Sequence, residues 1–241
     1  MNKRNIGFID NLTRAWDIFK GEPGMSLVGY LLFMAFITAA MYIICIGWIA
    51  WVIVLQFPLT AGLMIYYRRM SHGEKGDINQ LFAPLKDIGK WMGVGWLYML
   101  INIGTMIPLI GAIFVSALIL IPAIQNISNG NSDAYIPLIA LAVLIIFSGM
   151  LLTFVLSLVL VTRYMFVWFA AADGAGIVES FNQSAQLTEG IRWNLLAVYA
   201  GYMVLMMLGG LIFGIGQIVA AVLYMFGIAL IYDDLKASTV S

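Results

Sequence analysis

Residues able to carry acid–base or metal chemistry are few in this chain and lie far apart. The chain has one histidine, His72, and one cysteine, Cys45. His72 and Glu74 would make a proton-transfer couple, but a histidine in such a polar loop is ordinarily solvated. One histidine and one cysteine cannot build a structural zinc site. The sequence therefore predicts no catalytic residue, no metal and no cofactor, and a protein that is not an enzyme.

Two sets of polar residues remain as candidate sites. Gln56, Asn102 and Gln217 lie inside apolar stretches, where they either hydrogen-bond between helices or line a polar cavity. Arg163 follows an apolar stretch and precedes Asp173 by ten residues. Its side chain either reaches the lipid phosphates or pairs with a buried partner. Arg163 and Asp173 are therefore candidate headgroup or ion-pair contacts.

The elements that must position these residues are membrane-spanning helices. Of the 241 residues, 63% are hydrophobic and only 10% are charged. A soluble domain has roughly 45–50% apolar and about 25% charged residues, which excludes both a soluble enzyme and a disordered chain. No Asp, Glu, Lys or Arg occurs in residues 23–67, 91–132, 134–162 or 193–232. Because a spanning helix needs about 20 apolar residues, these windows predict an all-α, polytopic transmembrane helix bundle.

The lengths of the outer windows indicate hairpins. As a single helix, residues 23–67 would be about 68 Å long, so this window must fold back once, near residues 46–48. Residues 193–232 divide in the same way at residues 209–214. The spacing of Gly210 and Gly214 at that point fits either a helix-packing face or a flexible turn.

The two middle windows flank a polar stretch at residues 125–133. We expect one long span on each side, the first bent or broken at Pro108 with Gly111 and at Pro122. The chain then has about six spans, arranged as three helical hairpins. The alternative breaks each middle window into two shorter helices and gives eight spans.

Basic residues indicate the orientation. In the six-span arrangement all 12 Lys and Arg residues fall on one side, and Asp133 is the only charge on the other. The positive-inside rule then places both termini in the cytoplasm, and the eight-span arrangement keeps that orientation. The formal net charge is zero, so no basic field points to nucleic acid as a partner.

Each hairpin is preceded by a short amphipathic stretch, at residues 6–19, 78–88 and 177–189. In the second stretch, Asp77 and Gln80 have the spacing of a capping box. The pattern predicts a single integral membrane domain, 1–241, with three possible units, 6–67, 77–162 and 173–235. The short helices either lie in the headgroup layer or pack on the bundle as ordinary loop helices, and both can hold.

Three segments together resemble a known group of proteins. They are residues 58–74, with Arg68-Arg69 and His72-Gly73-Glu74; residues 173–190, from Asp173 to Gly190; and residues 213–235, ending in Tyr232-Asp233-Asp234-Leu235. In this order they resemble a broad prokaryotic group of uncharacterised multi-pass membrane proteins, similar to the membrane domain of some glycerophosphoryl diester phosphodiesterases. The resemblance implies a compact helical bundle in a bacterial or archaeal cell (inner) membrane. It implies no phosphodiesterase activity, because that chemistry belongs to a separate soluble barrel domain.

Two functions fit these patterns. The first is a non-catalytic integral membrane protein that organises lipids or partner proteins at the cytoplasmic face, with residues 68–90 and 173–192 as the contact region. Its partners would be membrane lipids and other membrane proteins, and the oligomeric state stays open. The alternative is a transporter, permease subunit or lipid-moving protein, which the hairpins and the Pro-interrupted third span favour modestly.

Overall fold

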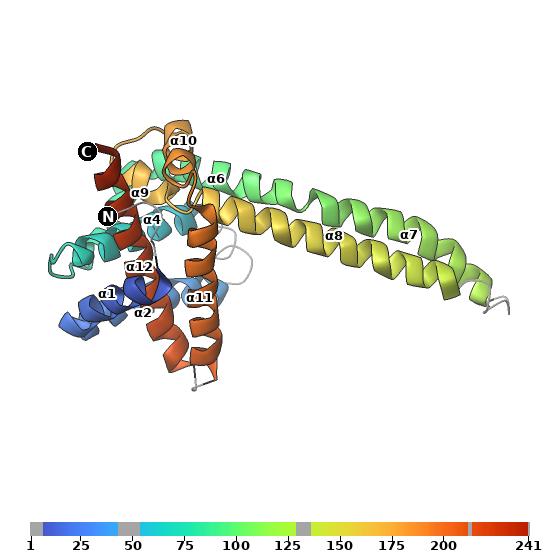
Figure 1. Ribbon diagram of the computed structural model, residues 1–241, viewed down its shortest axis with the longest axis horizontal. Helices are drawn as coiled ribbons and strands as arrows, with labels where there is room; N and C mark the ends of the chain where they lie inside the picture. The colour runs from blue at the N-terminus through green and yellow to red at the C-terminus, as the bar shows by residue number, and fades with distance from the viewer. Residues whose placement is uncertain (1–6, 43–53, 129–135, 212–213, 241) are drawn as a thin grey trace. The chain divides into compact units, whose positions relative to one another are not determined.

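The computed structural model describes residues 7–42, 54–128, 136–211 and 214–240, and all regular structure in them is helical (Figure 1). The all-α fold class is therefore confirmed. In chain order the helices are α1 (Phe8–Gly21), α2 (Pro23–Tyr42), α4 (Gln56–Ser71), α5 (Asn79–Phe82), the 3₁₀ helix η2 (Ala83–Asp87), α6 (Ile88–Thr105), α7 (Ile107–Ser128), α8 (Ile136–Arg163), α9 (Val167–Ala172), α10 (Ile177–Leu187), α11 (Arg192–Gly210) and α12 (Ile215–Val240).

Five stretches of the described chain are long and apolar enough to cross a membrane, judged by length and composition. They are Pro23–Ala40, Asn79–Ile124, Ile136–Ala172, Arg192–Gly210 and Ile215–Ser238. The chain is thus a multi-pass α-helical membrane protein. The turn expected near residues 46–48 lies outside the described residues.

Contacts divide the chain into two compact units, which are described separately. The first unit comprises residues 1–96 and 162–241, and the second comprises residues 97–161. In chain order, α1 precedes α2 and α4, α5 with η2 precedes α6 to α8, and α10 precedes α11 and α12. All 12 Lys and Arg residues belong to the first unit.

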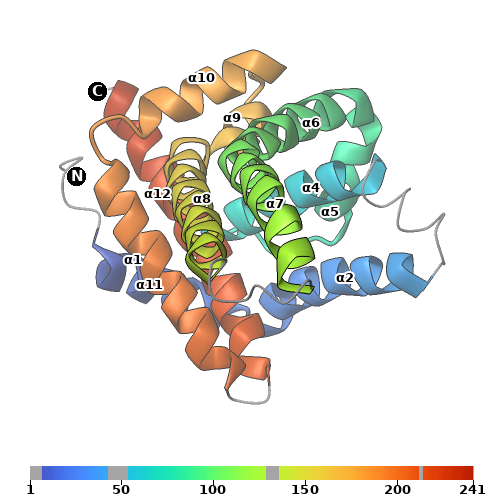
Figure 2. The same cartoon turned by 90° about the vertical axis from the view of Figure 1, so that its right-hand side faces the viewer.

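Helix α12 is the centre of the first unit. Inside its candidate span 56% of the residues are buried, against at most 22% in the other four spans. It contacts α1, α2, α4 and α11. Figure 2 shows α1, α11 and α12 gathered on one side of this unit, with α2, α4 and α5 on the other. The largest fully buried side chains are aromatic: Tyr66, Tyr67, Tyr202, Tyr232, Phe166, Phe169 and Phe226.

Two tyrosines of α4 fix the α2–α4 pair. Tyr66 donates a hydrogen bond to the Met25 carbonyl at 2.6 Å, and Tyr67 donates to the Ser26 carbonyl at 2.7 Å. Gly29 makes this approach possible, because a Cβ there would lie 2.5 Å from the Tyr66 ring. The tyrosine hydroxyls thus find hydrogen-bond acceptors inside the interface, so neither polar group is left unsatisfied.

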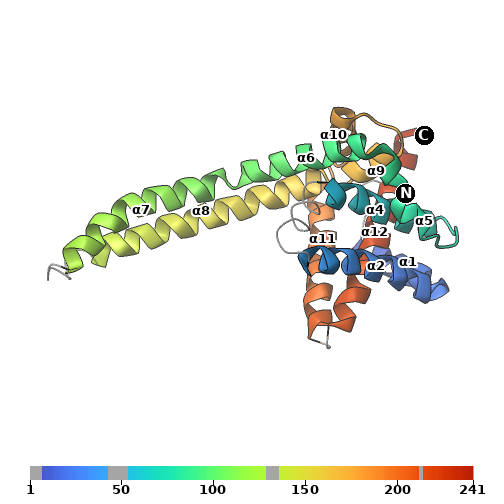
Figure 3. The same ribbon diagram turned by 180° about the vertical axis from the view of Figure 1, so that it is seen from behind.

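The second unit is a helical hairpin in which α7 and α8 run antiparallel (Figures 1 and 3). Among the residues of this unit whose burial is described, the buried ones are all small: Thr105, Ala112, Ser116, Ala123, Ala142, Gly149 and Thr153. They recur at intervals of seven and four along each side of the hairpin, the heptad spacing of a coiled-coil seam. A Cβ at Gly149 would lie 2.4 Å from the Ala112 Cβ, and the Ser116 hydroxyl donates to the Ala142 carbonyl at 3.0 Å. Small residues thus let the two backbones approach closely.

Of the two prolines expected to bend or break this window, Pro108 coincides with a break. Helix α6 ends at Thr105 and α7 begins at Ile107, directly before Pro108, which has no amide hydrogen to continue the ladder. Pro122 lies inside an unbroken α7. Helix α8 also runs without interruption over 28 residues, whereas the eight-span alternative requires a break there.

All three short amphipathic stretches form helices, and one of them is divided into two short helices. α1 and α10 are single helices, but residues 79–87 divide into α5 and η2, where Pro84 interrupts the α-helical ladder. The capping box expected there forms only in part. The Asp77 carboxylate accepts the Asn79 amide hydrogen at 3.0 Å, but the buried Gln80 side-chain oxygen has no hydrogen-bond partner.

Two glycines flank the α11–α12 connection, of which residues 212 and 213 lie outside the described part of the chain. Helix α11 ends at Gly210, and Gly214 has a positive φ of 75° just before α12. The glycines that bring the two helices together are Gly209 and Gly216. A Cβ at Gly209 would lie 2.4 Å from the Gly216 carbonyl carbon.

Candidate functional site at the ends of α4, α9 and α12

The side chain of Arg68 joins three helices at one end of the first unit. Arg68 lies in the last turn of α4 and is only 16% exposed. Its Nη1 lies 2.6 Å from Asp173 Oδ1, directly after α9, and its Nη2 lies 2.8 Å from Asp233 Oδ1 on α12. The guanidinium carbon also lies 4.7 Å from the ring centroid of Tyr232. One cation therefore holds two carboxylates and an aromatic face.

Asp173 accepts hydrogen bonds from three directions. Besides Arg68, Tyr232 donates through its hydroxyl at 2.6 Å and Lys236 through Nζ at 2.5 Å. Burial by itself would raise the pKa of the Asp173 carboxyl, but the hydrogen bonds from Arg68, Lys236 and Tyr232 outweigh burial and lower that pKa below its usual value. Asp173 is therefore held as a carboxylate at neutral pH.

Two further contacts extend this group. His72 Nε2 lies 2.8 Å from Asp233 Oδ2. Arg14 of α1 contacts both oxygens of Asp234, at 2.5 and 3.2 Å. The hydrogen bond to Asp234 raises the pKa of Arg14, although burial opposes it. We call this set the ion-pair cluster; its members are Arg14, Arg68, His72, Asp173, Tyr232, Asp233, Asp234 and Lys236. It ties α1, α4, α9 and α12 together.

The backbone around Asp173 is fixed by its neighbours. Gly174 ends α9 with a φ of 101°, a conformation that favours glycine. Lys90 Nζ donates to the Ala171 carbonyl at 2.7 Å. Ser184 of α10 accepts the Phe166 amide hydrogen at 3.2 Å and donates to the Arg163 carbonyl at 3.0 Å. Helix α10 thus caps the end of α8 and supports α9, packing on the unit through its buried serines.

A pocket of about 320 Å³ lies beside the cluster, with Arg68, Arg69, His72, Glu74 and Asp173 in its lining. Arg69 is 51% exposed and lies 3.9 Å from Glu74, at the limit of an ion pair. Charges of both signs line this pocket. Among the described residues, no group of three His, Cys, Asp or Glu side chains could hold a metal ion. The arrangement can hold helices in register and present a charged surface.

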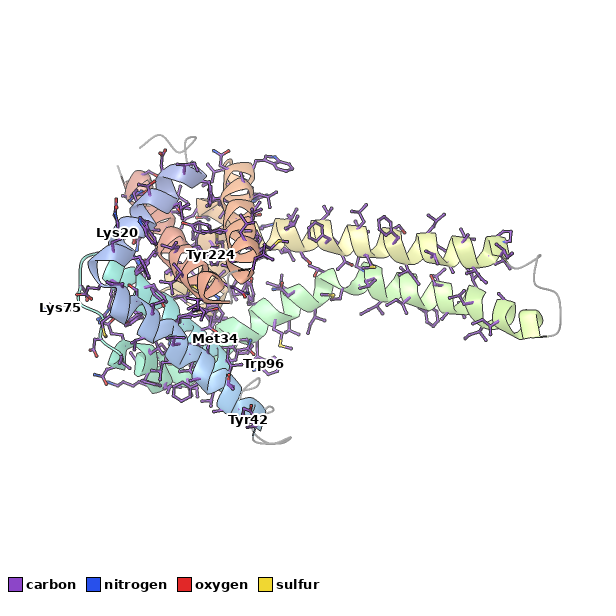
Figure 4. All side chains as sticks on the ribbon, turned by 90° about the horizontal axis from the view of Figure 1, so that it is seen from below. Lys20, Met34, Tyr42, Lys75, Trp96 and Tyr224 are labelled. Carbon is purple, nitrogen blue, oxygen red and sulfur yellow. The ribbon has the colours of Figure 1, made fainter. Side chains whose placement is uncertain are left out.

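Figures 1, 3 and 4 show the first unit from different directions. In Figure 4 the labelled Lys20 and Lys75 lie at one end of this unit, and Met34, Tyr42 and Trp96 lie farther along it. The C-terminal end of α12 and helices α9 and α10 lie together at one end of the unit (Figures 1 and 3). Ion pairs thus gather where the apolar helices end.

The three candidate cavity residues lie on three different helices, α4, α6 and α12. Gln56 begins α4 and Gln217 lies in the first turn of α12, so along their helix axes they lie about 18 and 24 Å from Arg68 and Asp233 respectively. The Gln217 side-chain oxygen faces Gly210 in the α11–α12 turn. Asn102 belongs to the second unit, where its amide donates to the Tyr98 carbonyl at 2.8 Å.

Arg163 and Asp173 have different surroundings. The Asp173 carboxylate forms ion pairs, with Arg68 and Lys236 as its partners. Arg163 ends α8 as an exposed residue, and its guanidinium carbon lies 5.5 Å from the ring centroid of Tyr164. Sequence reasoning missed Arg68 and Asp233 as site residues. The available signal was their position, since each directly follows a charge-free window.

Fold and site together define a multi-pass helical membrane protein with an ion-pair cluster at one end of its larger unit. No family model matches the chain, and no curated protein or solved structure is significantly similar to it. The three segments that carry the family resemblance do converge in space: Arg68 and His72, Asp173, and Tyr232 with Asp233 come from one segment each.

Proposed function

We propose that the protein is a non-catalytic membrane protein that organises lipids or partner proteins at the cytoplasmic face of a bacterial or archaeal cell membrane. The ion-pair cluster is the observation that carries this proposal. It joins α1, α4, α9 and α12 by side chains that satisfy one another, which makes the charged end of the first unit a fixed platform.

The pairing within the cluster supports a non-catalytic role. A general acid or base must be able to exchange its proton with a substrate, and a nucleophile must be free to attack. Asp173 is occupied by three donors, and Asp233 by Arg68 and His72. Such saturation suits a structural connection better than proton transfer.

Charge and exposure support the choice of face. The 12 basic residues all belong to the first unit, which by the positive-inside rule favours a cytoplasmic position for its charged end. At the starts of α5, α10 and α11, apolar side chains remain exposed beside charged residues in the sequence: Ile78, Ile177, Val178 and Trp193, the last 82% exposed. Exposed apolar residues among charges are typical of surfaces that meet lipid headgroups or another protein.

The test uses the full chain in gently solubilised membranes and in reconstituted vesicles. We expect it to retain a defined partner on affinity capture or to change lipid packing, reported by a polarity-sensitive membrane dye. Arg68→Gln should abolish the effect by loosening the platform, and the neighbouring Arg69→Gln should serve as the matched control. Absence of both a partner and a packing change would reject the proposal. Flux of solutes, ions or fluorescent lipids in the same vesicles would support a transporter in its place.

A further inference from the structure

An apolar groove lies between α1 and the α11–α12 pair of the first unit. Its volume is about 610 Å³, within the roughly 300–1,000 Å³ typical of small-molecule sites. Leu12 and Trp16 line it from α1, Leu205 and Leu208 from α11, and Val219 and Leu223 from α12. Thr13 is the only lining residue with a hydroxyl, amide or charged side chain, so an apolar ligand suits the groove best.

The helices that form the groove are fixed in place. The Asn11 side chain of α1 donates to the Gly227 carbonyl at 3.0 Å and accepts the Tyr202 hydroxyl hydrogen at 2.8 Å, in a buried network. At the far end of the groove, Gly209 and Gly216 bring α11 and α12 into backbone contact. The groove therefore results from anchored helices and does not need a helix to move before it forms.

The groove runs along a membrane-spanning helix, away from the charged end. Leu223, Val219 and Gly216 lie about 15, 21 and 26 Å before Asp233 along α12. Because the hydrocarbon core is about 30 Å thick, residues at these distances from the charged end lie within the thickness that lipid tails occupy. Helix α1, with charged residues on its outer side, crosses the groove at its shallow end, where an amphipathic helix meets headgroups.

Helix α1 carries a cation, Lys20, one helical turn beyond the part that lines the groove. Lys20 follows Trp16 by four residues and therefore lies on the same face of α1. Its ion pair with Asp17, at 2.8 Å, is exposed on both sides. Exposed pairs of this kind contribute little free energy, so Lys20 can exchange Asp17 for a phosphate.

We propose that this groove binds one acyl chain of a membrane phospholipid, with the phosphate of the same lipid beside Lys20. The site goes beyond the proposed function, because none of the groove-lining residues belongs to the ion-pair cluster. Loss of the platform would leave the groove lining intact, and loss of lipid binding would leave the cluster intact.

The test is acyl-chain photolabelling of the full chain in nanodiscs. The discs contain phosphatidylcholine and phosphatidylglycerol, with a trace of phosphatidylglycerol that carries a diazirine on one acyl chain. We expect adducts to concentrate on residues 12–16, 205–208 and 219–223. The adduct yield there should exceed that on exposed apolar residues of the second unit, such as Leu151 and Phe154. A uniform distribution of adducts over exposed apolar residues would overturn the proposal.

Two neighbouring residues of α11 give a matched pair. Leu205→Trp fills the groove, whereas Val204→Trp adds the same ring at a position that does not line the groove and is 55% exposed. Leu205→Trp should lower groove labelling by roughly tenfold, equivalent to about 1.4 kcal/mol, and Val204→Trp should leave it unchanged. Equal labelling in both variants would refute an occupied groove. If Leu205→Trp fails to fold, the wild-type adduct map still decides the proposal.

Lys20→Gln tests the phosphate contact separately. It removes the cation and keeps the apolar lining, so we expect weaker groove labelling. With a phosphatidylcholine probe run in parallel, the wild type should label more strongly with the phosphatidylglycerol probe, and Lys20→Gln should lose that preference. Unchanged labelling and preference would overturn the assignment of the headgroup to Lys20.

Discussion

In the first unit the largest fully buried side chains are aromatic rings, and ion pairs connect the helix ends. In the second unit every buried residue is small, and among the described residues 97–128 and 136–161 none is charged. The first unit thus depends on interlocking large side chains and on charge pairing outside the hydrocarbon. The second depends on close backbone approach within it. The difference shows two ways to join helices where lipid tails are as apolar as the helices themselves.

Arg68→Gln should produce the largest effect and confine it to the first unit. Removing this cation leaves Asp173 and Asp233 without their shared partner, which should cost about 2–3 kcal/mol, below the cost for a fully buried pair because the cluster is partly exposed. The measurement is unfolding in a denaturing-detergent titration, with tryptophan fluorescence as the signal. All seven Trp residues belong to the first unit, so the signal reports on that unit.

Arg69→Gln is the matched control for Arg68→Gln. Arg69 is half-exposed and reaches Glu74 only at 3.9 Å, so its loss should cost less than about 1 kcal/mol. Equal costs for the two neighbouring arginines would show that the cluster does not stabilise the first unit.

Gly149→Ala and Gly111→Ala should have opposite effects in the second unit. The new Cβ at Gly149 meets Ala112 at 2.4 Å, which should cost about 1–3 kcal/mol by overpacking. At Gly111 nothing lies within 4 Å of the added Cβ, so the better helix propensity of alanine should stabilise the helix by up to about 1 kcal/mol. Hydrogen–deuterium exchange over residues 97–161 measures both. The same sign in both variants would contradict a close-packed seam.

The stability of the two units should respond differently to acid. The pKa of Asp173 in the folded protein is lower than in the unfolded chain, so this group contributes its full stability above about pH 4, and that contribution is lost as the pH falls through the lowered pKa. The first unit should therefore loosen below about pH 4, while the helices of the second unit, which have no ionisable charge, should not respond. Fluorescence and hydrogen exchange report the two units independently.

The variant that checks this assignment is Asp173→Asn. It should lower stability at neutral pH, because the amide no longer neutralises Arg68 and Lys236, and it should make the acid response shallower. An unchanged pH dependence in Asp173→Asn would assign the acid response to other carboxylates.

How much the sequence predicts depends on whether a feature is local. The all-α class and the hairpin order follow from charge-free windows, and one proline break follows from Pro108, because these depend on neighbouring residues alone. Asp173 was likewise a candidate, but its nearest cation in sequence, Arg163, is not its partner. The partners, Arg68 and Lys236, lie 105 and 63 residues away.

Those partners are set by packing that one sequence does not display. Arg68 reaches Asp173 because α4 and α9 both pack in the first unit, which depends on large side chains from several helices. The grouping of Gln56, Asn102 and Gln217 in one polar cavity stays a prediction, because it depends on how their three helices pack.

Two hydroxyls in the hairpin seam should give the smallest effects, again with opposite signs. Thr153 Oγ1 is buried without a hydrogen-bond partner, so Thr153→Val replaces an unsatisfied hydroxyl by a methyl group of similar shape and should stabilise the second unit by up to about 1 kcal/mol. Ser116→Ala removes the hydrogen bond to the Ala142 carbonyl and should destabilise it by about 0.6 kcal/mol, the average for such bonds between membrane helices. Hydrogen exchange of residues 97–161 in the same nanodiscs compares them. If Thr153→Val destabilised the hairpin as much as Ser116→Ala, hydroxyl hydrogen bonds would stabilise the seam at both positions. Both units would then depend on polar contacts, and they would differ only in whether those contacts are hydrogen bonds or ion pairs.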